Sequence, residues 1–105
     1  MNKIAFLNDG LRRTFARGKV VMTDGVGALP EDVLTQVLER VRHFDEFTKD
    51  NDPHGEHDFG TFELAGVSYF FKIDYYAPDM EGGSEDPADP EKTTRVLTIM
   101  RADEY

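Results

Sequence analysis

The sequence predicts an α+β fold, a two-layer sandwich in which two helices cover one face of an antiparallel sheet of about four strands. Two segments carry apolar residues at helical spacing, and four short segments are β-branched or alternate apolar with polar residues. Their order along the chain is α-β-α-β-β-β. Because 105 residues suffice for one modest core, we expect a single globular domain over residues 1–105.

The first element is an amphipathic helix over residues 3–16, with Asn2 as its N-cap. The apolar residues at helical spacing are Ile4, Leu7, Leu11 and Phe15, and the polar residues elsewhere on the helix are Asn8, Arg12 and Arg13. Gly18 ends the helix, and the β-branched run at residues 19–23 predicts a strand.

The second helix begins near Pro30, which suits a first helical position. Glu31 and Asp32 complement the positive end of the helix dipole. One apolar stripe follows, formed by Val33, Leu34, Val37, Leu38, Val41 and Phe44. This stripe predicts that the helix packs on the core.

Three further strands are predicted in the second half of the chain. Residues 61–64 and 67–75 alternate apolar and polar side chains on either side of Ala65-Gly66, which predicts a β-hairpin. Residues 94–100 form a nearly continuous apolar run, which is typical of an interior strand.

Charge is distributed unevenly along the chain. Its 12 basic and 21 acidic side chains leave a net charge of −9. Residues 1–42 hold seven basic and five acidic side chains, a net of +2, whereas residues 43–105 hold five and sixteen, a net of −11. We therefore expect no direct binding to nucleic acid, because phosphate neutralisation supplies most of that affinity.

The composition also restricts the setting of the protein. With no cysteine, disulfides and cysteine-ligated metals are excluded. No stretch approaches the roughly 18 apolar residues of a membrane helix, and the opening apolar run is too short for a signal peptide. We expect a cytoplasmic protein that does not contact membranes.

A polar loop at residues 52–58 combines two imidazoles with three carboxylates, ligand types that suit zinc, manganese or iron. The candidate metal ligands are Asp52, His54, Glu56, His57 and Asp58. One alternative is a loop locked by aspartate turns and by a histidine bound to a carboxylate or backbone group. Another is proton transfer by His54 or His57. A calcium loop starting at Asp50 is not expected, since Thr61 stands where a bidentate glutamate belongs.

A second polar loop, residues 77–92, is rich in proline, glycine and acid. Its carboxylates belong to Asp79, Glu81, Glu85, Asp86, Asp89 and Glu91, and they are the candidate partner-binding residues. Carboxylates at this density can imitate phosphates and occupy the basic groove of a nucleic-acid-binding protein. The alternative is that they only solvate the loop.

Two other chemistries are not expected. Residues 24–30 resemble a phosphate-binding glycine loop, but Pro30 replaces the third glycine and acidic residues surround the would-be anion site. The two serines, Ser68 and Ser84, lack the surroundings of a nucleophile. We expect no cofactor.

Several stretches together resemble a known family. They are Leu7-Asn8-Asp9, Val20-Val21-Met22-Thr23, Asp50-Asn51-Asp52-Pro53-His54-Gly55-Glu56-His57-Asp58-Phe59-Gly60, Lys72-Ile73-Asp74-Tyr75-Tyr76 and Thr94-Arg95-Val96-Leu97-Thr98-Ile99-Met100. Through them the chain resembles an alphaproteobacterial family catalogued as domain of unknown function 3768. The family has no assigned activity, so no site residues carry over. Its members resemble cargo of plasmids and other mobile elements, which implies a role in conflict between mobile DNA and host defence.

We therefore expect a small acidic, non-enzymatic binding protein that inhibits a nucleic-acid-binding defence system of the anti-CRISPR or anti-restriction type. Its partner would be a basic protein such as a nuclease or a CRISPR or restriction component. One alternative is a metal- or histidine-dependent enzyme centred on residues 52–58. Another is a regulatory or homodimeric protein that uses the hairpin face around Phe70 and Tyr76, unless loops cover that face.

Overall fold

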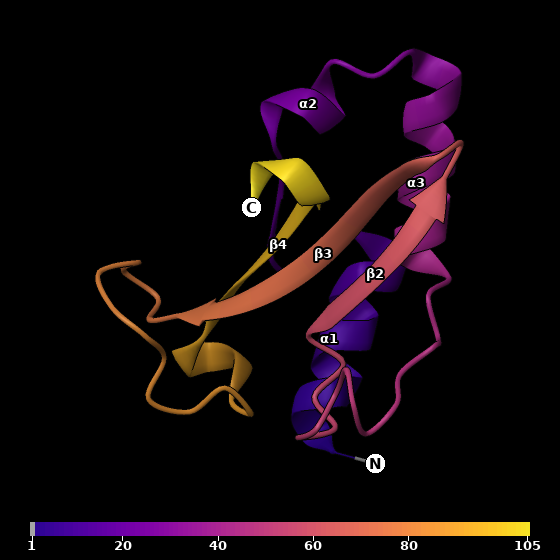
Figure 1. Ribbon diagram of the computed structural model, residues 1–105. Coiled ribbons are helices and arrows are strands. Elements are labelled where there is room, and N and C mark those ends of the chain that lie inside the picture. Colours follow the sequence, from indigo (N-terminus) through magenta and orange to yellow (C-terminus); the bar gives the residue numbers. More distant parts are fainter. Residues whose placement is uncertain (1) are drawn as a thin grey trace.

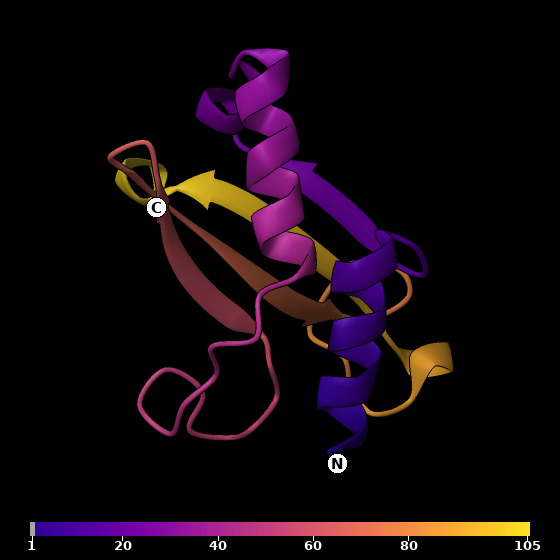
Figure 2. The ribbon, with the colours of Figure 1, turned by 90° about the vertical axis from the view of Figure 1, so that its right-hand side faces the viewer.

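The computed structural model describes residues 2–105. The helices are α1 (Lys3–Thr14), α2 (Asp24–Gly27) and α3 (Glu31–Arg42). The strands are β1 (Lys19–Met22), β2 (Phe59–Leu64), β3 (Val67–Tyr76) and β4 (Thr94–Arg101), and the short 3-10 helices η1 (Pro90–Lys92) and η2 (Ala102–Glu104) flank β4. α1 and α3 lie on one face of a four-stranded sheet (Figure 1, Figure 2). The predicted α+β two-layer fold is confirmed, with the one-turn helix α2 as an addition.

The strand order in the sheet is β1-β4-β3-β2. β3 pairs antiparallel with both β2 and β4, as expected. β1 pairs parallel with β4, with Val20 opposite Leu97, so the sheet is mixed and not wholly antiparallel. The two parallel strands are the first and last of the chain, and local sequence patterns do not fix the relative direction of strands so far apart.

The hairpin between β2 and β3 has the predicted turn. Leu64 lies opposite Val67, and Ala65 and Gly66 connect them with φ angles of 53° and 79°. Two successive left-handed residues form the turn whose twist matches that of the flanking strands.

The core lies between the sheet and the two long helices. It is formed by buried residues that include Val37, Val41 and Phe44 from α3 and its end, Phe71 and Ile73 from β3, and Leu97 and Ile99 from β4. The predicted stripe of α3 therefore packs on the core. Gly60 of β2 is required by this packing, because a Cβ atom there would lie 2.5 Å from the ring of Phe71 and 2.7 Å from that of Phe44.

α1 begins as predicted, with the Asn2 side chain accepting a hydrogen bond from the backbone N–H of Ile4 at 2.8 Å. It ends at Thr14, two residues early, because Phe15 adopts the left-handed conformation with a φ of 55°. The expectation that Asn8 and Arg12 lie on a polar side is wrong, since they are 0% and 1% exposed. α3 and the loop between α3 and β2 cover that side of α1 (Figure 2).

The hairpin face that carries Phe70 is partly covered by aromatic side chains. The rings of Phe59 and Tyr105 lie 5.4 Å and 5.1 Å from the Phe70 ring, which leaves Phe70 8% exposed. Tyr76, on the same face, is half-buried. Part of the apolar surface on this face is thus explained within the chain.

Candidate functional site

The loop between α3 and β2, residues 43–58, is organised by Asp52. Its carboxylate accepts hydrogen bonds from the backbone N–H of Glu56 at 3.0 Å and of His57 at 3.2 Å. Gly55 allows the tight reversal between them with a φ of 65°. The Asp52 side chain therefore closes the loop on itself, as an aspartate turn does.

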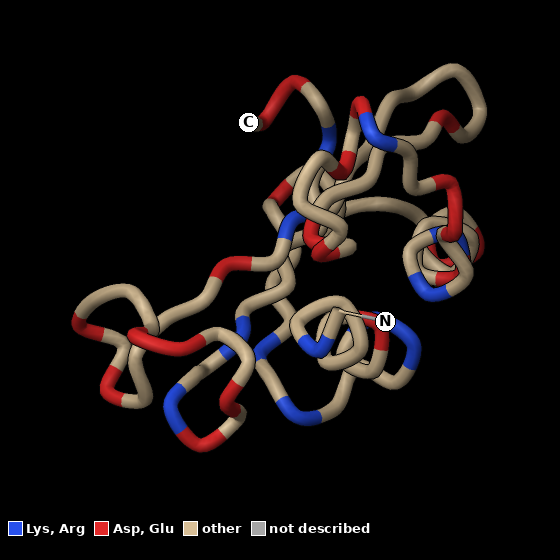
Figure 3. The backbone as a smooth tube through the Cα atoms, turned by 90° about the horizontal axis from the view of Figure 1, so that it is seen from below, with Lys and Arg blue, Asp and Glu red and all other residues tan. Residues whose placement is uncertain are grey.

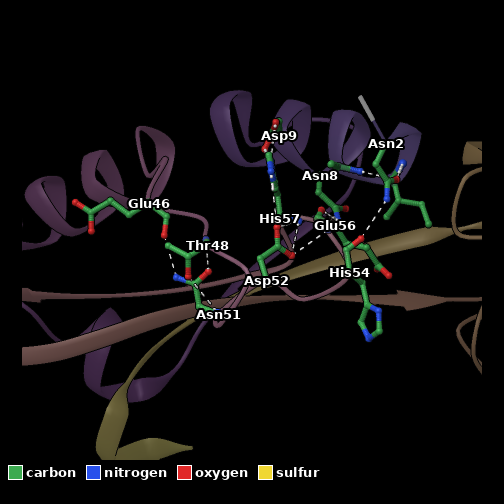
Figure 4. A network of polar contacts seen from close by, with 12 residues as sticks. Asn2, Asn8, Asp9, Glu46, Thr48, Asn51, Asp52, His54, Glu56 and His57 are labelled. Atoms are coloured by element: carbon green, nitrogen blue, oxygen red, sulfur yellow. Dashed lines mark hydrogen bonds and ion pairs between the residues drawn. The ribbon is translucent and has the colours of Figure 1, made fainter.

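His57 turns from this loop toward α1 (Figure 4). Its Nδ1 lies 3.0 Å from Asp9 Oδ1, and its Nε2 lies 3.7 Å from Asp52 Oδ2. The imidazole ring stacks on the ring of Phe47 at 4.1 Å. The backbone of His57 has a φ of 57°, a conformation that non-glycine residues rarely adopt and that the side-chain contacts hold in place.

Asp9 continues this set of contacts into the helical layer. Its Oδ1 also accepts a hydrogen bond from Arg12 Nη2 at 2.9 Å. Arg12 Nη1 donates to the carbonyl oxygens of Val41 at 2.9 Å and Arg42 at 3.1 Å, which lie in the last turn of α3, where helix carbonyls lack their usual intrahelical partners. Burial lowers the pKa of Arg12, and the hydrogen bond to Asp9 opposes that shift. Asp9 and Arg12 thus join α1, α3 and the loop.

Asn8, next to Asp9, leads toward the sheet. Its Nδ2 donates to the hydroxyl of Tyr75 at 2.8 Å and to the carbonyl oxygen of Glu56 at 3.0 Å. The Tyr75 hydroxyl donates to Glu56 Oε1 at 2.7 Å, and Arg95 Nε donates to Asn8 Oδ1 at 2.8 Å. Burial and the Glu56 hydrogen bond raise the pKa of Tyr75, so it stays a neutral donor.

These side chains form one connected group, which we call the polar cluster: Asn8, Asp9, Arg12, Asp52, Glu56, His57, Tyr75 and Arg95. Sequence reasoning singled out Asp52, Glu56 and His57 but missed the other five. One feature of the sequence points to them: Asn8 and Arg12 are four residues apart, so they lie on the same side of α1 and could form a polar contact surface together.

The five candidate metal ligands are not gathered at one point. Asp52 binds backbone N–H groups, Glu56 binds Tyr75, and His54 is exposed. Burial raises the pKa of Asp58. Among residues 2–105, no three histidine, aspartate or glutamate side chains are placed to hold a metal ion. The histidine–carboxylate contact that we considered as an alternative is present.

The acidic loop, residues 77–92, follows the C-terminal end of β3 and projects away from the sheet (Figure 1, Figure 3). Three of its aspartates fix its backbone: Asp79, Asp86 and Asp89 each accept a hydrogen bond from an N–H two residues later, at 3.0, 3.2 and 2.9 Å. Glu85 lies 3.7 Å from Lys92 Nζ. Six carboxylates and one lysine leave this loop with a net charge of −5.

A groove of about 270 Å³ lies within the acidic loop. It is lined by Ala77, Pro78, Gly83, Glu85, Glu91 and Lys92. The groove therefore combines an apolar wall with two carboxylates.

The segment between β1 and α3, which resembles a phosphate-binding glycine loop in sequence, binds a carboxylate of the chain itself. Glu104 accepts hydrogen bonds from the hydroxyl of Thr23 at 2.6 Å and from the N–H of Gly25 at 2.8 Å. These hydrogen bonds lower the pKa of Glu104. A Cβ atom on Gly25 would lie 2.7 Å from the Glu104 side chain, so this contact requires glycine at position 25.

Ser84, one of the two serines considered as a nucleophile, has a structural role. Its hydroxyl donates to the carbonyl oxygen of Lys92 and is hydrogen-bonded to the hydroxyl of Thr93.

The comparisons with known proteins give one family. The family model described as "Protein of unknown function (DUF3768)" matches residues 22–104. No curated protein and no solved structure matches the chain. None of the helices among the described residues is long and apolar enough to cross a membrane.

Proposed function

The chain belongs to the DUF3768 family, and for it we propose a small acidic, non-enzymatic binding protein whose acidic loop engages a basic surface of a partner protein. The observation that carries this proposal is an ordered loop with a net charge of −5 that holds an open groove. Local charge of one sign attracts a partner of the opposite sign and speeds their association.

The order of the acidic loop supports binding over mere solvation. Asp79, Asp86 and Asp89 each use one oxygen on a backbone N–H, and each keeps a second oxygen for a partner. Because the backbone is already fixed by these bonds, little conformational entropy is lost when a partner binds.

The residues that line the groove suit a basic side chain. Ala77 and Pro78 would contact the aliphatic stem of an arginine or lysine, and Glu85 and Glu91 would accept hydrogen bonds from its charged head. Lys92 beside Glu85 would then give way to the partner's cation. An arginine-rich surface is the best fit, because its guanidinium groups bind carboxylates in pairs of hydrogen bonds.

Proteins that cut or bind nucleic acid carry such basic surfaces. We therefore propose a nuclease or a CRISPR or restriction component as the partner, met in the cytoplasm, with this chain acting as its inhibitor. The implied origin on mobile elements, which rests on resemblance, favours the same class.

The test is local charge reversal. Glu85, Asp86 and Asp89 are changed together to lysine, and inhibition or capture of the basic partner is measured at several salt concentrations. We expect binding to be lost and, in the unchanged protein, to weaken steeply as salt rises, since exposed charges are screened within about 8 Å at physiological ionic strength.

The matched control reverses Asp45, Glu46 and Asp50, three exposed acidic residues of the other polar loop. It alters the net charge by the same amount. If both triple variants weaken binding equally, the effect is due to net charge alone. If the reversal of Glu85, Asp86 and Asp89 does not weaken binding, the acidic loop is excluded as the binding surface.

A histidine- or metal-dependent enzyme at residues 52–58 is the second candidate, supported by the His57–Asp9 contact at 3.0 Å. A histidine oriented by a carboxylate is a common general base. Here Nε2 faces Asp52 at 3.7 Å, which leaves it poorly placed for a substrate. Elemental analysis of the unchelated protein, with a His54→Ala/His57→Ala variant as control, tests the metal form of this proposal.

A further inference from the structure

Arg95 is a buried cation at the start of β4, only 4% exposed. Its Nε donates to Asn8 Oδ1 at 2.8 Å, and its Nη2 donates to the carbonyl oxygen of Pro87. Its guanidinium also lies over the ring of Tyr75, 5.2 Å from the ring centre. One side chain therefore contacts the acidic loop, α1 and the neighbouring strand.

The contact with Pro87 lies in the middle of the acidic loop. Two other hydrogen bonds hold the middle of the loop from its flanking segments: Ser84 N–H donates to the carbonyl oxygen of Tyr75 at 3.1 Å, and the Thr93 hydroxyl donates to that of Asp86, next to Pro87, at 2.8 Å. Among these contacts, the one from Arg95 also joins the loop to α1. Through this contact, the Arg95 guanidinium places a positive charge next to the acidic loop, which has a net charge of −5. Its field reduces the repulsion that would otherwise spread the carboxylates apart.

The opposite end of Arg95 is fixed by an amide in one orientation. Asn8 accepts from Arg95 through Oδ1 and donates through Nδ2 to Tyr75 and Glu56, so a reversed amide would lose these bonds. The Tyr75 hydroxyl bonds Glu56 in turn. A continuous chain of hydrogen bonds thus runs from the loop at residues 43–58 to the carbonyl of Pro87.

We propose that Arg95 is the positioning residue of the acidic loop, and that Asn8 and Tyr75 connect the position of this loop to the loop at residues 43–58. The expected effect of Arg95 on partner binding rests on the proposed function, whereas its effect on the order of the loop does not. Arg95 itself, being buried, does not touch the partner.

The first test measures the order of the loop without any partner. In Arg95→Met, amide hydrogen exchange in residues 77–92 becomes about tenfold faster, because a hydrogen bond from a charged donor is lost. Val37→Ala, which empties space in the core far from Arg95 in sequence, is the matched control for general destabilisation. Unchanged exchange in residues 77–92 of Arg95→Met, or equal acceleration in Val37→Ala, overturns the proposal.

The second test measures binding of a fluorescein-labelled nona-arginine peptide as the basic probe. Arg95→Met should weaken binding by about fivefold although every surface carboxylate is kept, since a mobile loop loses entropy on binding. Arg95→Lys, which keeps the charge, should recover part of the affinity. If Arg95→Met does not fold, Arg95→Lys is compared directly with the unchanged protein and should show faster loop exchange.

The two proposals fail in different ways. If reversal of Glu85, Asp86 and Asp89 abolishes peptide binding while Arg95→Met leaves it unchanged, the positioning role is wrong and the binding surface stands. If the triple reversal has no effect, the binding surface is wrong, and the exchange experiment alone decides the role of Arg95.

The connection to the other loop is tested by Tyr75→Phe, which removes one hydroxyl beyond Asn8. Exchange in residues 77–92 should rise by about twofold, less than for Arg95→Met, because one neutral hydrogen bond is lost at a distance. No change in these residues would show that the chain of bonds ends at Asn8 and would overturn this part of the proposal.

Discussion

The two polar loops use their charged side chains in opposite ways. In residues 43–58, Asp52, Glu56 and His57 are bound to other groups of the chain. His57 joins the loop to α1 (Figure 4), and Glu56 joins it to Tyr75 of β3. In the acidic loop, the carboxylates bind nearby backbone N–H groups, pair with Lys92 of the same loop or face solvent. The loop that looks most like a reactive site is therefore the one whose polar groups are already satisfied by the fold. The loop that looks like simple solvation keeps its charge available.

The sharpest way to break this comparison is Asp9→Ala. The change leaves Arg12 and His57 without their shared carboxylate in a buried setting, which should lower the free energy of unfolding by about 3–5 kcal/mol. Urea denaturation followed by circular dichroism measures it. A loss below about 1 kcal/mol would mean that the polar cluster does not hold the fold together.

A smaller loss is expected for Asn8→Ala, about 1–3 kcal/mol, because Arg95 and Tyr75 each lose one hydrogen-bond partner. The same denaturation experiment applies. Combining Asn8→Ala with Tyr75→Phe should cost less than the sum of the separate losses, since both remove one shared bond. Full additivity would argue against a connected cluster.

The contact of Glu104 with Thr23 and Gly25 predicts a dependence on pH. A carboxyl whose pKa is lowered by folding adds stability above its unfolded pKa, near 4.3 for glutamate, and this stability is lost as the pH falls through the folded value. Glu104→Gln should therefore lower the melting temperature at neutral pH. On acidification, the melting temperature of this variant should fall less than that of the unchanged protein. Parallel curves for the two proteins between neutral pH and pH 3 or so would contradict this role.

The smallest effect is expected in the acidic loop. Glu81→Gln and Glu91→Gln should change the free energy of unfolding by no more than about 0.5 kcal/mol, because neither side chain supports the fold. A loss of about 2 kcal/mol from either change would give this loop the structural role that we assign to the other.

The fold was predictable where the pattern is local. The apolar stripe of α3 and the alternation around Ala65-Gly66 are readable over a few residues, and both elements form as expected. The parallel pairing of β1 with β4 was not predictable, because it joins residues at opposite ends of the chain.

The polar cluster escaped prediction for a related reason. His57 meets Asp9 across 48 positions and Arg95 meets Asn8 across 87, and no local period marks such pairs. Asn8 and Arg12 lie off the apolar stripe of α1, and polar side chains in such positions are usually exposed. Only the packing of α1 under α3 and the neighbouring loop reveals that they are buried.

The central claim, that the acidic loop and not the polar cluster carries binding, is tested most directly by site-specific photocrosslinking in the native host. One protein carries the crosslinking amino acid at Met80 in the acidic loop, and a second carries it at Lys49 in the other polar loop, both exposed positions. We predict that the crosslinker at Met80 reacts with a basic, nucleic-acid-binding protein, and that changing Glu85, Asp86 and Asp89 to lysine abolishes this crosslink. Crosslinking of the same protein from Lys49 alone, or from Met80 regardless of the charge reversal, would contradict the account.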